Sequence, residues 1–142
     1  VNLRNKTDEL AHKFSANGWI APENLSARFM SKDEYLLLKS DKLVFGWTLP
    51  YFSQAQKSYQ ILVASTAENI EKNVGDMWNS GCVFTNNSLN VEYKGKALEK
   101  GKTYYWRVRY WDYLNRTSQY SESQSFVYGD KSVSDVQNVS NA

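Results

Sequence analysis

The side chains best suited to acid–base chemistry are carboxyl groups, and these are scattered along the chain. Two carboxyl groups can act as general acid and general base when a cleft holds both near one bond and raises the pKa of one of them. No spacing among the acidic residues predicts such a pair. We interpret them as solvated loop charges and expect no catalytic residue and no enzymatic activity from this chain. The residues considered are Asp8, Glu9, Asp33, Glu34, Glu68, Glu71, Asp76, Glu92, Glu99, Asp112 and Glu122.

Histidine and cysteine each occur once, as His12 and Cys82. A Ser-His-Asp arrangement or a histidine-based metal site cannot be completed around His12 from obvious parts. Cys82 has no histidine beside it in the sequence to lower its thiol pKa, and a single cysteine excludes an internal disulfide. We therefore expect no metal and no cofactor, with His12 on the surface of an amino-terminal leader and Cys82 as a buried or edge thiol.

Aromatic and arginine side chains are the candidates for binding. In the stretch 103–112, Tyr105, Arg107, Arg109 and Trp111 occupy alternate positions, and Trp78 lies in a polar segment further upstream. Such side chains are enriched on docking surfaces. A second interpretation stays open, in which the arginines lie over the rings in cation–π pairs and shield the sheet. The predicted docking surface comprises Leu62, Trp78, Tyr105, Arg107, Arg109 and Trp111.

A β-strand must position these candidates, and residues 103–112 form the clearest one. Four large side chains alternate with the candidates: Tyr104, Trp106, Val108 and Tyr110. This period of two predicts a strand with one buried and one solvated face. Leu98 and Gly101 precede Tyr104 at the spacing of a tyrosine corner, in which the hydroxyl bonds back to the chain a few residues upstream. Because that corner is a β-sandwich device, the stretch predicts a β-sandwich.

Other segments complete the predicted sandwich. Residues 57–65 place Tyr59, Ile61 and Val63 inward, and a helical turn is expected around Glu68 to Lys72. The remaining expected strands are 25–30, 42–47, 76–80 at an edge, 89–93 and 118–128. About seven short antiparallel strands at hairpin spacing predict an all-β fold of the immunoglobulin-like or fibronectin type III kind. Its predicted core is Phe45, Trp47, Tyr59, Ile61, Val63, Leu98, Tyr104, Trp106, Val108 and Phe126.

The length of 142 residues suits one domain with a substantial core, and 15% aromatic residues can fill it. We expect a leader over 1–21, either a short helix or partly ordered, a sandwich over 22–130, and a linker over 131–142 to a missing downstream domain. A net charge of +2 without a basic stripe argues against nucleic acid as a partner. No apolar run is long enough for membrane insertion.

Several short motifs occur in an order that resembles the small amino-terminal domain of bacterial α-L-rhamnosidases of glycoside hydrolase family 78. The resemblance covers about 22–130. The matching residues are Trp47; Gln56, Tyr59, Gln60, Ile61 and Val63; Asp76, Trp78, Ser80 and Gly81; Tyr93, Gly95 and Leu98; and Tyr104, Trp106, Arg107, Val108, Trp111 and Asp112. Asn79 and Cys82 depart from the family pattern, and residues 1–21 and the insertion at Leu36 to Leu38 match nothing in it.

The resemblance implies a fibronectin type III-like accessory domain without catalytic function, because the family's rhamnoside chemistry lies in a separate α/α-barrel. The implied partners are other domains of the same polypeptide, and a rhamnose-containing carbohydrate is a further candidate. The alternative is a carbohydrate-binding or adhesive protein-binding module, with Trp78 or Trp111 stacking on a sugar ring. The compartment stays open, with a bacterial periplasmic or secreted setting favoured over the cytoplasm.

Overall fold

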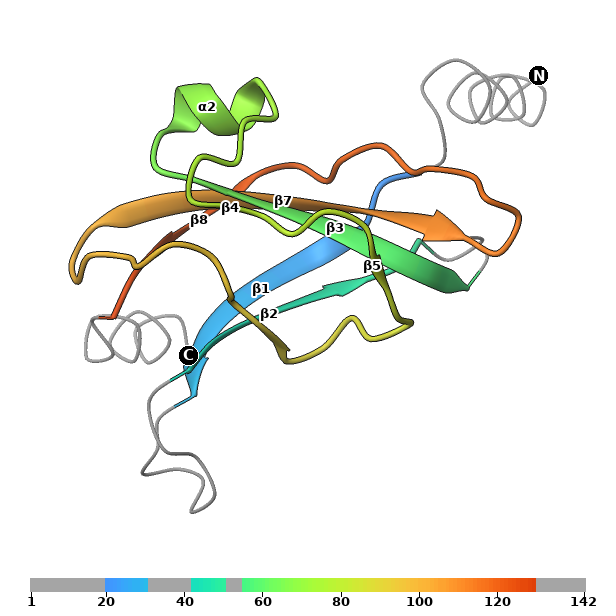
Figure 1. Cartoon of the computed structure of the whole chain (residues 1–142), viewed down its shortest axis with the longest axis horizontal. Helices are drawn as coiled ribbons and strands as arrows, with labels where there is room; N and C mark the ends of the chain where they lie inside the picture. Colours follow the sequence, from blue (N-terminus) through green and yellow to red (C-terminus); the bar gives the residue numbers. More distant parts are fainter. Residues whose placement is uncertain (1–19, 31–41, 51–54, 130–142) are drawn as a thin grey trace, which may run out of the picture.

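The computed structural model describes residues 20–30, 42–50 and 55–129, which form a sandwich of two antiparallel sheets (Figure 1). The three-stranded sheet has the order β1 (Glu23–Met30), β2 (Lys42–Thr48) and β6 (Val91–Glu92). The five-stranded sheet has the order β4 (Trp78–Asn79), β3 (Gln56–Ala64), β7 (Thr103–Asp112) and β8 (Gln124–Val127), with β5 (Val83–Phe84) also paired to β3. The predicted all-β sandwich is confirmed, and β5 is a strand that the sequence pattern did not reveal.

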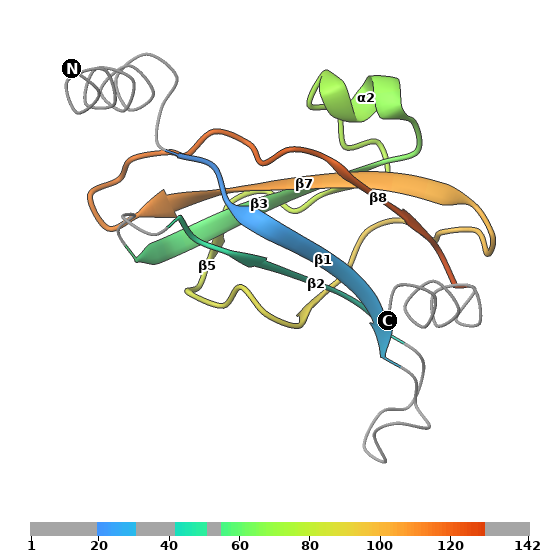
Figure 2. The same cartoon turned by 180° about the vertical axis from the view of Figure 1, so that it is seen from behind.

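The short helix α2 (Ala67–Glu71) lies outside the five-stranded sheet, on the side away from β1 and β2 (Figures 1 and 2). Thr66 caps it, because its hydroxyl accepts a hydrogen bond from the Asn69 amide at 3.1 Å. The expected helical turn is therefore present, one residue earlier than predicted. No helix of the described ranges is both long and apolar enough to cross a bilayer.

The core between the sheets is built from aromatic rings around Phe45 of β2. The ring centroid of Phe45 lies 4.4 Å from that of Trp106 and 5.8 Å from that of Phe126, both of the opposite sheet. Strand β7 alternates as predicted, with every second side chain from Tyr104 to Asp112 buried. Of the ten residues predicted for the core, all but Leu98 are buried in this cluster, and Leu98 packs against it half-buried.

Two tryptophan–glutamine pairs join the sheets. Trp47 Nε1 donates to Gln56 Oε1 at 3.0 Å, so that β2 is bonded to β3 across the core. Trp106 Nε1 donates to Gln124 Oε1 at 3.0 Å, and the amide of Gln124 donates in turn to the Leu25 carbonyl of β1 at 2.7 Å. A buried indole N–H needs an acceptor. Here Gln56 and Gln124 are the acceptors, and each of these side chains also connects one sheet to the other.

The last predicted strand, 118–128, is wrong in extent, because only Gln124–Val127 form β8. Residues 118–123 still run beside β7. There the hydroxyl oxygens of Ser118 and Ser121 accept hydrogen bonds from the amides of Tyr110 and Val108, at 2.9 and 3.1 Å. Side chains thus take the place of backbone carbonyls, and the regular ladder stops. Residues 1–19 of the leader predicted over 1–21, the insertion at Leu36 to Leu38 and the linker predicted over 131–142 lie outside the described residues.

The tyrosine corner is confirmed. The Glu99 amide donates to the hydroxyl oxygen of Tyr104 at 2.9 Å, and the ring of Tyr104 is buried against Phe126. Tyr104 lies five residues after Glu99, so this hydrogen bond fixes the turn that leads into β7.

We expect Tyr104→Phe to lower the free energy of unfolding by about 1 kcal/mol, the usual net value of one hydrogen bond. The ring stays in the core, so only the corner bond is lost. Urea denaturation followed by tryptophan fluorescence measures the change. Tyr105→Phe is the matched control on the opposite face of the same strand and should leave stability unchanged; an equal loss in both variants would contradict a special role for the corner.

Candidate functional site

Arg109, on the outer face of β7, is held between two aromatic rings. Its guanidinium lies 5.0 Å from the ring centroid of Trp111 and 4.5 Å from that of Tyr120. Its Nε donates to Gln60 Oε1 at 2.9 Å, and the hydroxyl of Tyr120 donates to the same oxygen at 3.1 Å. Burial raises the pKa of Tyr120, and the positive charges of the two arginines offset part of that rise. Hydrogen bonds and cation–π contacts thus connect the side chains of Gln60, Arg109, Trp111 and Tyr120. This arrangement agrees with the interpretation in which the arginines lie over the rings and shield the sheet.

Arg107 connects α2 to the sheet. Its Nη1 donates to the carbonyl of Ile70 at 3.2 Å and to Asn73 Oδ1 at 2.9 Å, and its Nε donates to the Ser121 carbonyl at 3.0 Å. A cation near the carboxyl end of a helix is also favourable electrostatically. Three hydrogen bonds therefore hold Arg107 within the domain.

Leu62 is buried, contrary to the prediction that it lines an exposed face. It does point to the outer face of β3, opposite Arg107 of β7. However, it is only 1% exposed, because α2 covers this part of the sheet and Leu62, Ala64 and Ile70 form a second buried cluster. Tyr105 packs against the same cluster and is half-buried.

Trp78 belongs to the edge of the core, although it was predicted as a ring exposed on an edge turn. It pairs with Val63, an inward residue of β3, and so points between the sheets. Its ring stacks on Phe45 at 6.3 Å and meets Tyr93 edge-on at 5.2 Å. Only part of the ring stays accessible, and one face is no longer free to stack on a partner.

Among the described residues, three of the five exposed large apolar side chains come from the end of the sandwich where β3 begins and β7 ends. Phe84 lies in one cross-strand row with Ser58 and Trp111, and Tyr113 and Leu114 follow directly after β7. We call Phe84, Trp111, Tyr113 and Leu114 the apolar end. Three of them are strongly exposed: Phe84 at 73%, Tyr113 at 63% and Leu114 at 62%. Strand β5 is too short to show alternation in the sequence. Tyr113 and Leu114, by contrast, are two large apolar residues between the predicted strands 103–112 and 118–128, and this pattern could have indicated an exposed apolar surface.

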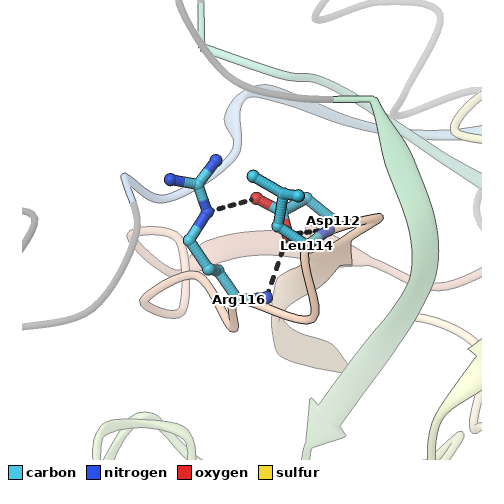
Figure 3. A network of polar contacts seen from close by, with 3 residues as sticks. All are labelled: Asp112, Leu114 and Arg116. Atoms are coloured by element: carbon cyan, nitrogen blue, oxygen red, sulfur yellow. Dashed lines mark hydrogen bonds and ion pairs between the residues drawn. The ribbon is translucent and has the colours of Figure 1, made fainter.

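Asp112 is fully buried, which corrects its interpretation as a solvated loop charge. Figure 3 shows its carboxylate inside the turn after β7: Oδ1 accepts from the amides of Leu114 and Arg116, each at 2.9 Å, and Oδ2 accepts from Arg116 Nε at 2.8 Å. Burial alone would raise the pKa of Asp112, but these hydrogen bonds and the Arg116 charge outweigh it, and the pKa lies below the ordinary value.

Asp76 has a similar structural role beside β4. Its carboxylate accepts from both the amide and the hydroxyl of Ser65. Burial favours the neutral acid, but the hydrogen bonds prevail and the pKa is lowered. Because a general acid needs a raised pKa, neither this carboxyl group nor that of Asp112 suits such a role.

Cys82 is exposed at the edge beside β5, and no group of three metal-ligating side chains occurs within the described ranges.

Two antiparallel sheets packed face to face, together with a tyrosine corner, define an immunoglobulin-like sandwich domain. A family model described as "Rha78A-like, N-terminal immunoglobulin domain" matches residues 25–130. The chain belongs to this family, and the resemblance to the amino-terminal domain of α-L-rhamnosidases is confirmed.

Known relatives carry the same domain within much longer chains. An α-L-rhamnosidase of Formosa agariphila is 36% identical over 101 residues, which are 70% of this chain and 11% of the relative. The solved α-L-rhamnosidase of Dictyoglumus thermophilum superimposes with a TM-score of 0.64 at 30% identity, over 78% of this chain and 12% of that one. That of Streptomyces avermitilis, solved with L-rhamnose, gives 0.62 at 26% identity over 78% and 11%. The chain thus spans about a tenth of these relatives.

Proposed function

We propose that this domain is a non-catalytic accessory part of a larger α-L-rhamnosidase-like glycoside hydrolase, in which it packs against neighbouring domains and stabilises or orients the catalytic one. The observation that carries the proposal is the match to the amino-terminal immunoglobulin domain of rhamnosidases, which makes up only about a tenth of those enzymes. The lowered pKa values of Asp76 and Asp112 support a role without acid–base chemistry, since both carboxylates are used to hold turns.

The apolar end is the surface that we assign to this packing. Interdomain interfaces bury apolar side chains inside a polar rim, and Phe84, Tyr113 and Leu114 are large apolar side chains exposed together where β3 begins and β7 ends. We do not assign the packing to the arginines of β7, since Arg107 bonds to the Ile70 carbonyl and Arg109 to Gln60 inside the domain.

The test uses the intact protein encoded by the complete gene. We expect Phe84→Ser combined with Leu114→Ser to lower the temperature at which rhamnosidase activity is lost, by several degrees, with KM unchanged. Val74→Ser is the matched control, because Val74 is also an exposed apolar residue but follows α2, away from the apolar end. Release of p-nitrophenol from its α-L-rhamnoside by the pure 142-residue chain, or equal heat resistance of all three proteins, would refute the proposal.

A further inference from the structure

A pocket of about 390 Å³ lies at the edge of the sandwich where β4, β5 and β6 are only two residues long. Tyr59 and Trp78 line it from the five-stranded sheet, and Val91 lines it from the three-stranded sheet. Tyr59 pairs with Val83, and both point inward. The short edge strands leave the gap between the sheets uncovered there. Tyr59 and Val91 are core residues only 7% and 5% exposed, whereas Trp78 and Val83 are only partly buried and offer accessible apolar surface.

The mouth of the pocket carries hydrogen-bonding side chains. Asn90, Glu92 and Lys94 contribute to its lining from the segment around β6. Two of these groups are fixed from outside: Arg28 Nη2 donates to Asn90 Oδ1 at 2.8 Å, and Lys42 Nζ donates to Glu92 Oε1 at 3.0 Å. The first bond leaves the Asn90 amide NH₂ as a donor, and the second leaves Glu92 Oε2 as an acceptor. Groups held in advance lose little freedom when a ligand binds.

A second hollow on the surface lacks this combination. It measures about 440 Å³ and lies between residues 22–25 and 122–124, without any aromatic ring in its lining. The edge pocket joins aromatic rings to planar polar groups, and its volume lies near the lower end of small-molecule sites, which span about 300–1,000 Å³. This combination suits a small ligand that has an apolar C–H surface and hydrogen-bonding groups at its rim.

We propose that this edge pocket binds a single neutral pyranose unit of a carbohydrate. The C–H groups of the sugar lie against the accessible parts of Trp78 and Val83, and its hydroxyl groups bond to Asn90, Glu92 and Lys94. Glu92 and Lys94 carry opposite charges, which suits a ligand without net charge. The pocket is distinct from the apolar end, so sugar binding does not depend on the packing role proposed above.

Nuclear magnetic resonance titration of the 142-residue chain with methyl α-L-rhamnopyranoside tests the proposal. We expect a dissociation constant on the order of 1 mM, as for other ligands of this size. The amide signals of Ser80, Val83 and residues 90–94 should shift together, while those of α2 should not. Absence of shifts at the pocket in large millimolar excess of the sugar would overturn the proposal.

Two neighbouring lysines provide a matched pair of variants. Lys94 lines the edge pocket, whereas Lys96 lines only an adjoining shallow hollow. We expect Lys94→Ala and Glu92→Ala each to weaken binding by roughly tenfold, the effect of one charge-assisted hydrogen bond, and Lys96→Ala to bind as the parent does. Dispersed amide spectra establish that each variant is folded. Equal affinity of all four proteins would overturn the assignment of this pocket even if the sugar binds elsewhere.

Discussion

Trp106→Ala is expected to lower the free energy of unfolding by about 3–5 kcal/mol, the range for deleting a large aromatic side chain from a core. Trp106 is completely buried, its ring lies 4.4 Å from that of Phe45, and its Nε1 supports Gln124. The variant therefore loses a ring contact across the sheets, leaves a cavity and removes the donor that orients Gln124. Since domains of this size are stable by only about 5–15 kcal/mol, the variant should unfold at a markedly lower urea concentration.

Urea denaturation followed by far-ultraviolet circular dichroism measures this loss. Tyr113→Ala is the control, because Tyr113 is an aromatic residue of the exposed apolar end and its removal should change stability by less than about 0.5 kcal/mol. A shift in midpoint as small for Trp106→Ala as for Tyr113→Ala would contradict a core built around Phe45 and Trp106.

The second large effect concerns Asp112→Asn, which we expect to cost about 2 kcal/mol at pH 7, as for loss of a charge-assisted hydrogen bond to a buried group. The asparagine oxygen can still accept from the two amides of the turn. Its NH₂ group, however, would face Arg116 Nε, donor against donor. The exposed pair Glu68–Lys72 has the same spacing of four residues, and Glu68→Gln should cost no more than about 0.5 kcal/mol.

The same carboxylate makes stability depend on pH. Its pKa is lower in the folded chain than the ordinary value of about 3.9, so its contribution is complete above that value and is lost as the pH falls through the folded pKa. The parent should therefore lose stability in acid more steeply than Asp112→Asn, and the two unfolding curves should approach each other. A difference between them that stays constant down to strongly acidic pH would contradict this account.

The sequence pattern predicted those features of the fold that depend on residues close together in the chain. The alternation from Tyr104 to Tyr110 is a property of one strand, and the tyrosine corner needs only the spacing from the turn to Tyr104. The burial of Leu62 could not be predicted in this way. Its outward direction follows from strand alternation, but its burial depends on where α2 packs. Asp112 likewise appeared as one acidic residue among many, and its burial arises from how the turn folds back on the strand end.

The candidate binding residues were predictable as a group but not in their roles. Sequence placed Arg107 and Arg109 on the outer face of β7, where they lie. Their partners come from residues distant in the chain, Ile70 and Asn73 for one and Gln60 and Tyr120 for the other. Side-chain contacts of this kind are set by tertiary packing, and strand periodicity carries no information about them.

The serine hydroxyls beside β7 have a consequence for how copies of this domain behave at high concentration. A strand edge with unfilled amides and carbonyls invites a strand from another molecule to add to it. Beyond β8, the amides of Val108, Tyr110 and Asp112 are bound by Ser121, Ser118 and the Arg116 carbonyl. This stretch of β7 is therefore closed to a strand from another molecule, although no regular strand covers it.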